Sequence, residues 1–517
     1  MTDEQPLDER VNNRSLRPGS PTFLAWVTSG WGPRAASGVT RSPAAGHAAD
    51  RRARLLARFD GPVRLVVPAG TPRVRSNDTD HRFRPHAAFA HLTGLGAEQE
   101  PDAVLTLGPG PDDATLYLRA PAGRDTPEFF ADARVGEFWV GPRPTLDDMA
   151  TLTGLRTADL SSLRDEIAKD VRPDGAAVAA PPGTPDRPGR ASERAPLSPR
   201  SGVRLLVVPG ADAAVTALVE QVRGGPDAGD DLLGEAVSEL RLVKDAYEVA
   251  QLRLAVAATI DGFAKVVQAL PAALAHPRGE RVVEGTFLGH ARTQGNYVGY
   301  ETIAASGPHA TTLHWTDDDG PVRPGDLLLL DAGVEADSLY TADLTRTLPV
   351  DGRFTPAQRQ VYQAVLDAAD AAFAAARPGA RFRDVHDAAM VVLADRLAAW
   401  GLLPVAPAVA LDPDQQQHRR WMVHGTSHHL GLDVHDCAQA RREMYTDGVL
   451  EPGMVFTIEP GLYFQPDDLL VPLELRGIGV RIEDDVLVTA DGCENLSAAL
   501  PRDPDAVEAW MADLRQH

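Results

Sequence analysis

Apolar residues in the second half of the chain recur at the spacing of amphipathic helices. The pattern predicts a long helix from residue 233 to about residue 270, with its leucines and valines mostly on one side. Thr355-Pro356 predicts a second helix start, with Thr as N-cap and Pro at the first helical position; this helix ends before residue 377. A third helix is expected over residues 383–400, ended by Gly401. Strands and turns fill the rest of this half.

Shorter apolar runs, separated by Gly, Pro and Asp, characterise the first half. They predict one helix and four strands: Ala48–Phe59, then Val63–Pro68, Ala103–Leu107, Thr115–Leu118 and Val203–Pro209. We therefore expect an α/β domain over residues 46–232, preceded by an N-terminal arm, residues 1–45. Residues 171–202 contain seven prolines and few large apolar side chains, and we interpret them as a surface insertion within this domain. Residues 233–517 form the second domain.

Four carboxylates lie in strand-like surroundings of the second domain. Asp331 ends the apolar run Leu327–Leu330, and Glu459 ends the run Met454–Ile458. A lone buried charge is costly, so such acids should be paired, hydrogen-bonded or bound to metal. Asp343 follows Asp331 after eleven residues, a spacing that allows a hairpin bringing the two acids together. The alternative is that Asp343 only pairs with Arg346 at a turn.

The fourth acid, Glu483, lies in an alternating segment, Ile478–Val488. Alternation places Arg481, Glu483 and Asp485 on one face of a single strand. The alternative interpretation is a solvated face on which Arg481 is exposed.

A histidine block lies between these acids: four histidines fall within twelve positions, from His424 to His435, among glycines and small residues. One imidazole with four carboxylates suits Mn, Co, Fe or Zn, and two divalent ions would balance the four negative charges. Paired metal ions lower the pKa of a shared water molecule and so generate a nucleophile at neutral pH. The set therefore predicts a hydrolase.

The histidines are not equivalent in this interpretation. We predict His428 as the metal ligand, and His424 and His435 as groups that face the substrate and stabilise a developing oxyanion. His429 should point the other way and be structural, as should His386 on its helix. His314 is a further candidate, for which the alternative is an ordinary packed histidine.

Composition narrows the class of partner. The chain has 517 residues, 43% of them hydrophobic, and a net charge of -22, which argues against nucleic acid and against an anionic membrane surface. Two cysteines are too few for a disulfide framework, and the acidic N-terminus lacks an apolar segment long enough for a signal. We expect a cytoplasmic protein.

The motifs taken together resemble those of aminopeptidase P, the Xaa-Pro aminopeptidases of the pita-bread metallopeptidases (family M24B). The matching segments, in order, are Leu330-Asp-Ala-Gly, Asp343-Leu-Thr-Arg-Thr, the block His424–Asp436, Glu451-Pro-Gly-Met, Thr457-Ile-Glu-Pro-Gly-Leu-Tyr463 and Arg476-Gly-Ile-Gly-Val-Arg-Ile-Glu-Asp-Asp485. The resemblance is strong over residues 235–500 and weaker in the first domain, at Arg75–Asp80 and Leu92–Gly94.

This resemblance implies an α+β protein, with an aminopeptidase P-type α/β domain followed by a pita-bread catalytic domain. It implies two divalent metal ions, most often Mn²⁺, with Co²⁺, Zn²⁺ or Fe²⁺ as other choices, and hydrolysis of the bond before a proline at the second position of a peptide. A homodimer or homotetramer is expected. The implied ligands are Asp331, Asp343, His428, Glu459 and Glu483.

The resemblance also implies roles for residues around the metals. Glu459 would shuttle the proton from the bridging water to the proline nitrogen, and His435 would steady the tetrahedral intermediate. His314, His424, Tyr463 and Arg481 would line the proline and C-terminal side of the substrate. Trp139 resembles a tryptophan that reaches a neighbouring subunit's active site.

Three departures and several rivals accompany the resemblance. The family usually has one residue fewer between the two aspartates, which a β-bulge would absorb; His309 stands where an asparagine is expected; and the insertion 171–202 has no match. An Xaa-Pro dipeptidase (prolidase) shares all five ligands. Methionine aminopeptidases generally lack the first domain, whereas creatinase-like enzymes and non-catalytic binding modules on this fold lack the metal ligands.

Overall fold

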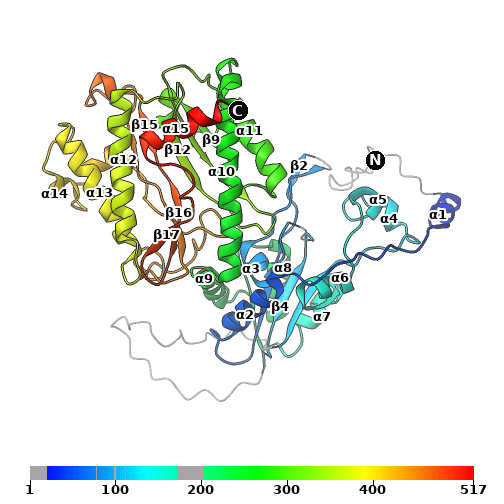
Figure 1. The fold of residues 1–517 in the computed structure, drawn as a ribbon. Coiled ribbons are helices and arrows are strands. Elements are labelled where there is room, and N and C mark those ends of the chain that lie inside the picture. Colours follow the sequence, from blue (N-terminus) through cyan, green and yellow to red (C-terminus); the bar gives the residue numbers. More distant parts are fainter. Residues whose placement is uncertain (1–19, 77–78, 98–99, 111, 172–201, 517) are drawn as a thin grey trace, which may run out of the picture. The chain divides into compact units, whose positions relative to one another are not determined.

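The computed structural model describes residues 20–76, 79–97, 100–110, 112–171 and 202–516 (Figure 1). The chain divides into two compact units, Met1–Val237 and Ser238–His517, five residues beyond the boundary expected from the sequence. Residues 1–19 of the predicted arm, 172–201 of the insertion and 77–78 of the Arg75–Asp80 motif lie outside the described residues.

The first unit is built on a five-stranded mixed sheet. Its strand order is β6-β5-β4-β1-β7, in which β1 runs parallel to β7 and antiparallel to β4. The strands are β1 (Val63–Pro68), β4 (Val104–Leu107), β5 (Ala114–Leu118), β6 (Arg156–Asp159) and β7 (Arg204–Val207), and a separate hairpin joins β2 (Val74–Ser76) to β3 (Thr79–Asp80). The predicted strands are confirmed, and the first domain resumes after the insertion, as the sequence predicts, with β7 pairing with β1.

Helices surround this sheet because each has an apolar face to bury. They are α2 (Ala44–Leu56), α3 (Ala87–Thr93), α6 (Leu146–Thr153), α7 (Leu163–Ile167) and α8 (Ala213–Arg223). One core joins Val66, Val104 and Leu205 of the strands to Leu163 and Val219 of the helices. The described part of the unit also contains the short helices α1 (Pro21–Val27), α4 (Glu128–Ala131) and α5 (Glu137–Val140).

The prediction of one long helix from residue 233 to about residue 270 is wrong, because this segment forms two helices, α9 (Gly229–Leu240) and α10 (Ala246–Leu274). The chain leaves the helix between them because Val243 bridges Met454 and the Lys244 N–H donates to the Gly453 carbonyl (2.9 Å). Asp245 then starts α10 with a capping box, accepting from the N–H groups of Tyr247 and Glu248. An apolar periodicity does not reveal this break.

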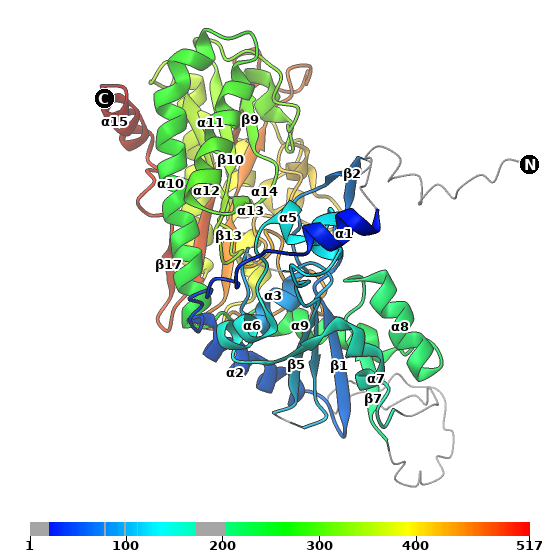
Figure 2. The same ribbon diagram turned by 90° about the vertical axis from the view of Figure 1, so that its right-hand side faces the viewer.

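Two antiparallel helix pairs flank the strands of the second unit (Figures 1 and 2). The pairs are α10 with α11 (Gly279–Gln294) and α12 (Pro356–Ala375) with α13 (Phe382–Ala399), and α15 (Pro504–Leu514) lies across α10 and α12. Thr355 caps α12 and Gly401 adopts the left-handed conformation after α13, as predicted. By length and mean hydropathy α10 could cross a membrane, yet much of it is buried against α11 in the core.

Asp331 and Asp343 are brought together by the predicted hairpin. β10 (Leu327–Ala332) pairs with β12 (Leu344–Pro349) on one side and with β9 (Ile303–Ser306) on the other. Asp331 pairs with Thr345, and four residues further along Glu335 pairs with Thr341, so the strand register does not change between the two pairs. The expected bulge is therefore wrong: the eleven-residue spacing is closed by the turn 336–340, in which Leu339 has a φ of 70°.

The single strand predicted over Ile478–Val488 is interrupted. β15 (Gly479–Arg481) pairs with β14 (Gly461–Tyr463), and β16 (Asp484–Val488) pairs with β13 (Val455–Ile458) and β17 (Cys493–Asn495). Glu459 lies at the break between β13 and β14, and Glu483 at the facing break, where its N–H donates to the Thr345 carbonyl (3.0 Å). Both acids thus lie between two short strands, where the pairing of β13 with β16 ends and that of β14 with β15 begins.

Candidate metal centre

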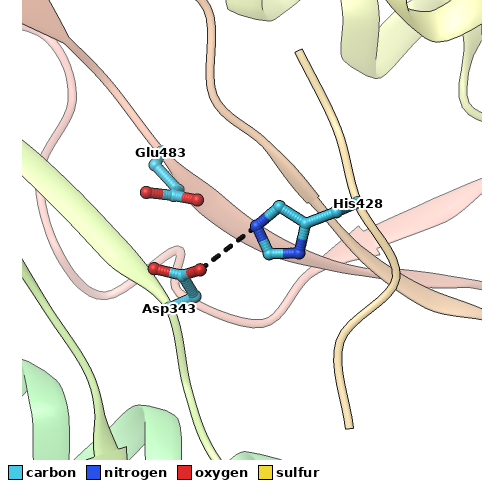
Figure 3. Close-up of side chains that lie close together, drawn as sticks. All are labelled: Asp343, His428 and Glu483. Atoms are coloured by element: carbon cyan, nitrogen blue, oxygen red, sulfur yellow. Dashed lines mark ion pairs between the residues drawn. The ribbon is translucent and has the colours of Figure 1, made fainter. Parts of the chain in front are cut away.

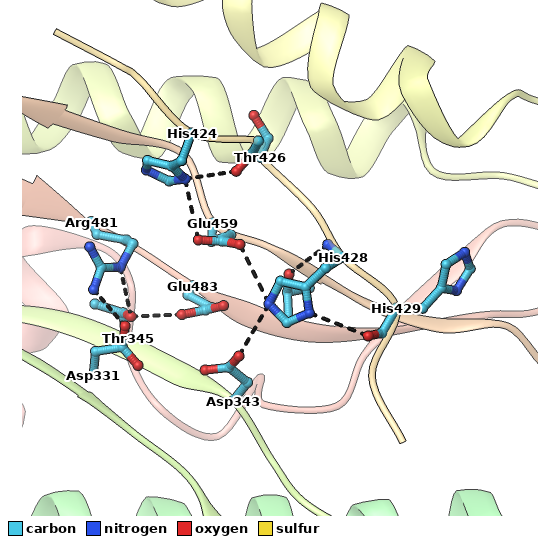
Figure 4. A network of polar contacts seen from close by, with 12 residues as sticks. Asp331, Asp343, Thr345, His424, Thr426, His428, His429, Glu459, Arg481 and Glu483 are labelled. Atoms are coloured by element: carbon cyan, nitrogen blue, oxygen red, sulfur yellow. Dashed lines mark hydrogen bonds and ion pairs between the residues drawn. The ribbon is translucent and has the colours of Figure 1, made fainter. Parts of the chain in front are cut away.

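Five residues, those proposed from sequence as metal ligands, line one cavity of about 490 Å³ in the second unit. They come from the β10–β12 hairpin, the histidine block and the two strand breaks (Figure 4): Asp331, Asp343, His428, Glu459 and Glu483. His314, His424, His435 and Arg481 line the same cavity.

Asp343, His428 and Glu483 form the tightest group (Figure 3). One potential ligand atom from each lies within 4.8 Å of the other two, and His428 Nε2 is 3.2 Å from Asp343 Oδ2. The side chains of Asp343 and Glu483 are buried, and Thr345 Oγ1 donates to Glu483 Oε2 (2.7 Å). Three residues whose side chains can each ligate a divalent ion therefore lie close together.

Glu459 lies beside this group. Its two oxygens are each 3.5 Å from an imidazole nitrogen, Oε1 from His428 Nε2 and Oε2 from His424 Nδ1. The carboxylate thus reaches from the proposed ligand His428 to a histidine on the other side of the cavity (Figure 4).

Asp331 is held by a charged partner and by a tyrosine that the sequence analysis missed. Arg481 Nη2 donates to Asp331 Oδ2, and Tyr300 Oη bonds Asp331 Oδ1 (2.6 Å) and Asp343 Oδ1. Tyr300 follows β8 (Tyr297–Val298), in a segment with no apolar pattern or motif that would have selected it. Only the spatial meeting of the two aspartates reveals its role.

The carboxylates disfavour one another's ionisation. Burial raises the pKa of Glu459 to about 7, with His428 and Arg481 opposing the shift and the neighbouring aspartates adding to it. Burial, then the surrounding acids, also raise the pKa of Glu483 well above its usual range and raise that of Asp343. Burial alone would lower the pKa of His428, but Asp343 and Glu459 raise it to about 9.

This charge distribution fits bound cations. Four carboxylates with one fixed cation, Arg481, crowd a largely buried site, and Asp485 adds a fifth acid behind Asp343, whose N–H it accepts (3.2 Å). Asp485 Oδ1 is buried with no hydrogen-bond partner in the described part of the chain. Divalent ions would supply the missing positive charge, and the oxygen and imidazole donors suit them.

His424, Tyr463 and Arg481 form a hydrogen-bonded chain, in which His424 and Arg481 line the cavity, whereas Tyr463, which is 4% exposed, is not among the lining residues. Arg481 Nη1 donates to Tyr463 Oη (3.0 Å), which is 2.8 Å from His424 Nε2, and His424 Nδ1 contacts the Gly425 carbonyl (2.7 Å). A carbonyl only accepts, so Nδ1 carries the proton and Nε2 accepts from Tyr463. Burial, followed by Arg481, lowers the pKa of His424 to about 3, so the ring is neutral.

His435 and His314 present exposed side chains to the cavity. The ring of His435 meets that of His428 edge-on, with centroids 4.5 Å apart. Burial, then the charge of His428, lower the pKa of His435. Both histidines are thus accessible from the cavity.

His429 and His386 lie outside the cavity lining. His429 is buried and stacks on Phe382 with centroids 4.6 Å apart, pointing away from the acids (Figure 4). His386 on α13 bonds Thr426 Oγ1 (2.8 Å) and so supports the histidine block from behind. Both have structural contacts, as the sequence analysis expects.

Two alternatives raised from sequence are wrong. Arg346 does not pair with Asp343: it is fully buried and donates to Asp484 Oδ1 (2.6 Å) and to the Glu483 carbonyl (2.6 Å). Arg481 is 3% exposed, so the segment around Glu483 is not a solvated face.

Trp139 lies in the first unit, on α5, and 57% of its side chain is exposed. Its indole N–H donates to the Phe130 carbonyl (2.7 Å). Its predicted role in a neighbouring subunit's active site stays a prediction.

Family models match both units of the chain. Residues 250–490 match metallopeptidase family M24, and residues 48–178 match the aminopeptidase P N-terminal domain. Together with the carboxylate–histidine cavity, these matches define an M24 metallopeptidase with an aminopeptidase P-type first domain.

Relatives and solved structures extend over nearly the whole chain. Xaa-Pro aminopeptidases 1 and 2 of Streptomyces coelicolor are 47% and 49% identical, covering 99% and 98% of this chain and 96% and 99% of their own lengths. The structure of Pseudomonas aeruginosa aminopeptidase PepP is 29% identical, with a TM-score of 0.74 over 92% of this chain and 100% of that one. A zinc-substituted Escherichia coli aminopeptidase P in complex with product is 28% identical, with the same TM-score and the same coverage. The chain belongs to the Xaa-Pro aminopeptidases of family M24.

The predicted fold class is thereby confirmed. The chain has an aminopeptidase P-type N-terminal domain followed by a C-terminal pita-bread domain, with helices and sheets in both.

Proposed function

We propose that this protein is a metallo-aminopeptidase that hydrolyses the bond between an N-terminal residue and a following proline. One observation carries the proposal: the five predicted ligands line one cavity in a chain that matches Xaa-Pro aminopeptidases over almost its full length. The family relationship gives the activity, and all five proposed metal ligands among the cavity's lining residues support it.

Asp331, Asp343, His428, Glu459 and Glu483 are proposed to hold two divalent ions. When bound, such ions polarise the scissile carbonyl and lower the pKa of a water molecule so that it can attack at neutral pH. The tight group Asp343, His428 and Glu483 supports one position. Asp331 and Glu459, which line the same cavity, are proposed to complete a second position.

Glu459 is proposed to carry the proton. Its carboxylate oxygens lie between His428 and His424, so it can take a proton on the metal side and release it toward the leaving nitrogen. The leaving nitrogen of an Xaa-Pro bond is the imino nitrogen of proline, which must be protonated as the bond breaks.

The side of the cavity lined by His424 and Arg481, with Tyr463 bonded to both, is proposed to receive the proline and the residues after it. Both nitrogens of the His424 ring are already bonded, which suits an apolar pyrrolidine ring, and the buried Tyr463 ring supports His424 with centroids 5.5 Å apart. His435 and His314, exposed in the same cavity, are proposed to face the reacting carbonyl and the C-terminal side.

Substrate length separates this function from that of a prolidase, which the comparisons do not favour. Metal-replete protein should cleave Xaa-Pro-Xaa tripeptides, releasing the first residue. Cleavage restricted to Xaa-Pro dipeptides would overturn the proposal in favour of a dipeptidase. Protein that binds no transition metal and cleaves neither peptide after Mn²⁺ is added would indicate a non-catalytic binding module.

Further proposals concern the cell and the assembly. We propose Mn²⁺ as the metal, because oxygen donors dominate the site, and the Mn²⁺ content of protein purified without added metal tests this choice.

We propose a homodimer or homotetramer, to be tested by light scattering, with Trp139→Ala reporting whether the exposed indole contributes to a neighbour's activity. A cytoplasmic location is proposed from the low cysteine count, and fractionation tests it.

A further inference from the structure

A buried carboxylate outside the metal centre is bonded to both ends of the segment that carries His314. Glu280, in the first turn of α11, has a fully buried side chain and a backbone N–H that donates to the Gly320 carbonyl (3.0 Å). It lies outside the residues that line the metal cavity.

Glu280 accepts four hydrogen bonds from one loop. Oε1 accepts from the Ser306 N–H (2.8 Å) and faces His309 Nδ1 (2.8 Å), whereas Oε2 accepts from Trp315 Nε1 (3.0 Å) and the Gly320 N–H (2.6 Å). Ser306 and Gly320 begin and end the loop, and the two ring groups lie within it. A carboxylate satisfies all four donors at once, which no neutral side chain of this shape can do.

The loop held in this way contributes directly to the cavity. Leu313, His314 and Thr316 line it, on either side of Trp315. The indole of Trp315 also stacks on His309, with ring centroids 3.8 Å apart and planes at 24°. His309 occupies the position where the family pattern expects asparagine, so in this chain the loop is fixed by an imidazole–indole stack as well as by hydrogen bonds.

His314 has no comparable anchor of its own. It is exposed, and no hydrogen bond or ion pair of its side chain is present within the described residues. Its position therefore depends on the backbone that carries it, and that backbone is fixed one residue away by Trp315.

We infer that Glu280 is the positioning residue for the substrate-facing loop, fixing His314 in the cavity through His309, Trp315 and the two backbone ends. The inference rests on the proposed peptidase function and adds a residue that touches neither metal nor substrate.

Glu280→Gln tests this role. The amide NH₂ would face two of the four donors in either orientation, so the loop loses two anchors while volume is preserved. With Xaa-Pro-Xaa tripeptides we expect a fall in kcat/KM of about 10- to 100-fold, the cost of misplacing a contact group, with metal content unchanged. The separate changes in KM and in kcat should match those that His314→Ala causes.

A double variant distinguishes positioning from general damage. In the His314→Ala background, Glu280→Gln should change kcat/KM by less than about 3-fold, because the group that it positions is already gone. Glu284→Gln, one turn further along α11 and without a side-chain hydrogen bond in the described structure, is the matched control and should behave as wild type.

Two outcomes overturn the inference. One is folded Glu280→Gln protein with wild-type kcat/KM; the other is a full multiplicative loss in the His314→Ala background. If Glu280→Gln does not fold, Trp315→Phe provides the test, because it deletes one hydrogen-bond donor to Glu280 and keeps an aromatic ring stacked on His309. Trp315→Phe must then change KM and kcat in the same way as His314→Ala. In the His314→Ala background, Trp315→Phe must have no further effect. Wild-type protein that fails to cleave tripeptides would instead refute the proposed function.

Discussion

Tyr300 links the two aspartates of the metal centre through one hydroxyl. Its Oη contacts an oxygen of Asp331 and an oxygen of Asp343, although it has one proton to donate. Burial, and then the two aspartates, raise the pKa of Tyr300 well above its usual range, so the hydroxyl stays protonated. It therefore orients carboxylates that would otherwise repel one another.

Tyr300→Phe should weaken metal binding by about 10- to 100-fold, the usual cost of losing a partner of a metal ligand. Activity of chelated protein, titrated with Mn²⁺, measures the effect. Tyr297→Phe, on the exposed strand β8, is the control. Equal metal affinity for Tyr300→Phe and wild type would contradict the role.

Asp318, which lies outside the metal centre, makes the stability of the fold depend on pH. Burial raises its pKa to about 7, opposed by a hydrogen bond from the Ala304 N–H and supported by Glu280. A carboxyl whose pKa is raised in the folded state favours the protonated form. Its contribution to the stability of the fold is therefore fully present below pH 3.8 and is lost as the pH rises through about 7.

Asp318→Asn should therefore gain stability relative to wild type as pH rises across that window, because asparagine can accept from Ala304 and cannot ionise. The urea midpoints of both proteins at about pH 5 and about pH 8 measure this difference. Asp319→Asn, at the exposed neighbour, should show no such trend. A difference between Asp318→Asn and wild type that does not change with pH would contradict the assignment.

At the scale of elements, the break between α9 and α10 illustrates what the sequence could not show. Helix periodicity continues through residues 241–245, yet the chain there pairs with Gly453 and Met454, more than two hundred positions away. The strand breaks at Glu459 and Glu483 are of the same kind. Caps and buried strands were predictable because they depend on local residues, whereas these breaks depend on distant partners.

Asp245→Ala removes the N-cap that restarts the helix at Ala246. The loss should lower the free energy of unfolding by about 1 kcal/mol, the usual value for such a cap. Urea unfolding measures it, with Asp261→Ala on the exposed face of α10 as the control, where alanine should be neutral or slightly stabilising. Equal midpoints for Asp245→Ala and wild type would show that packing alone fixes the start of α10.

At the scale of the whole molecule, one cavity gathers residues spread from Tyr300 to Glu483. The motifs allowed the five ligands to be proposed from sequence, because family spacing identifies residues that meet in space. Tyr300 and Glu280 were beyond that reasoning: their roles come from contacts, and no spacing marks them. Alternation placed Asp485 on one face with Glu483, but its contact with the Asp343 N–H was not predicted. The acidic balance of the chain, -22 overall, includes the carboxylates that the metal ions would neutralise.

The most direct test of the account is metal titration of chelated protein during tripeptide hydrolysis. We predict no activity after chelation, recovery that saturates at two ions per chain, and no recovery in His428→Ala at the same metal concentration. Full activity of metal-free protein, or recovery in His428→Ala equal to wild type, would contradict a dinuclear centre built on these five residues.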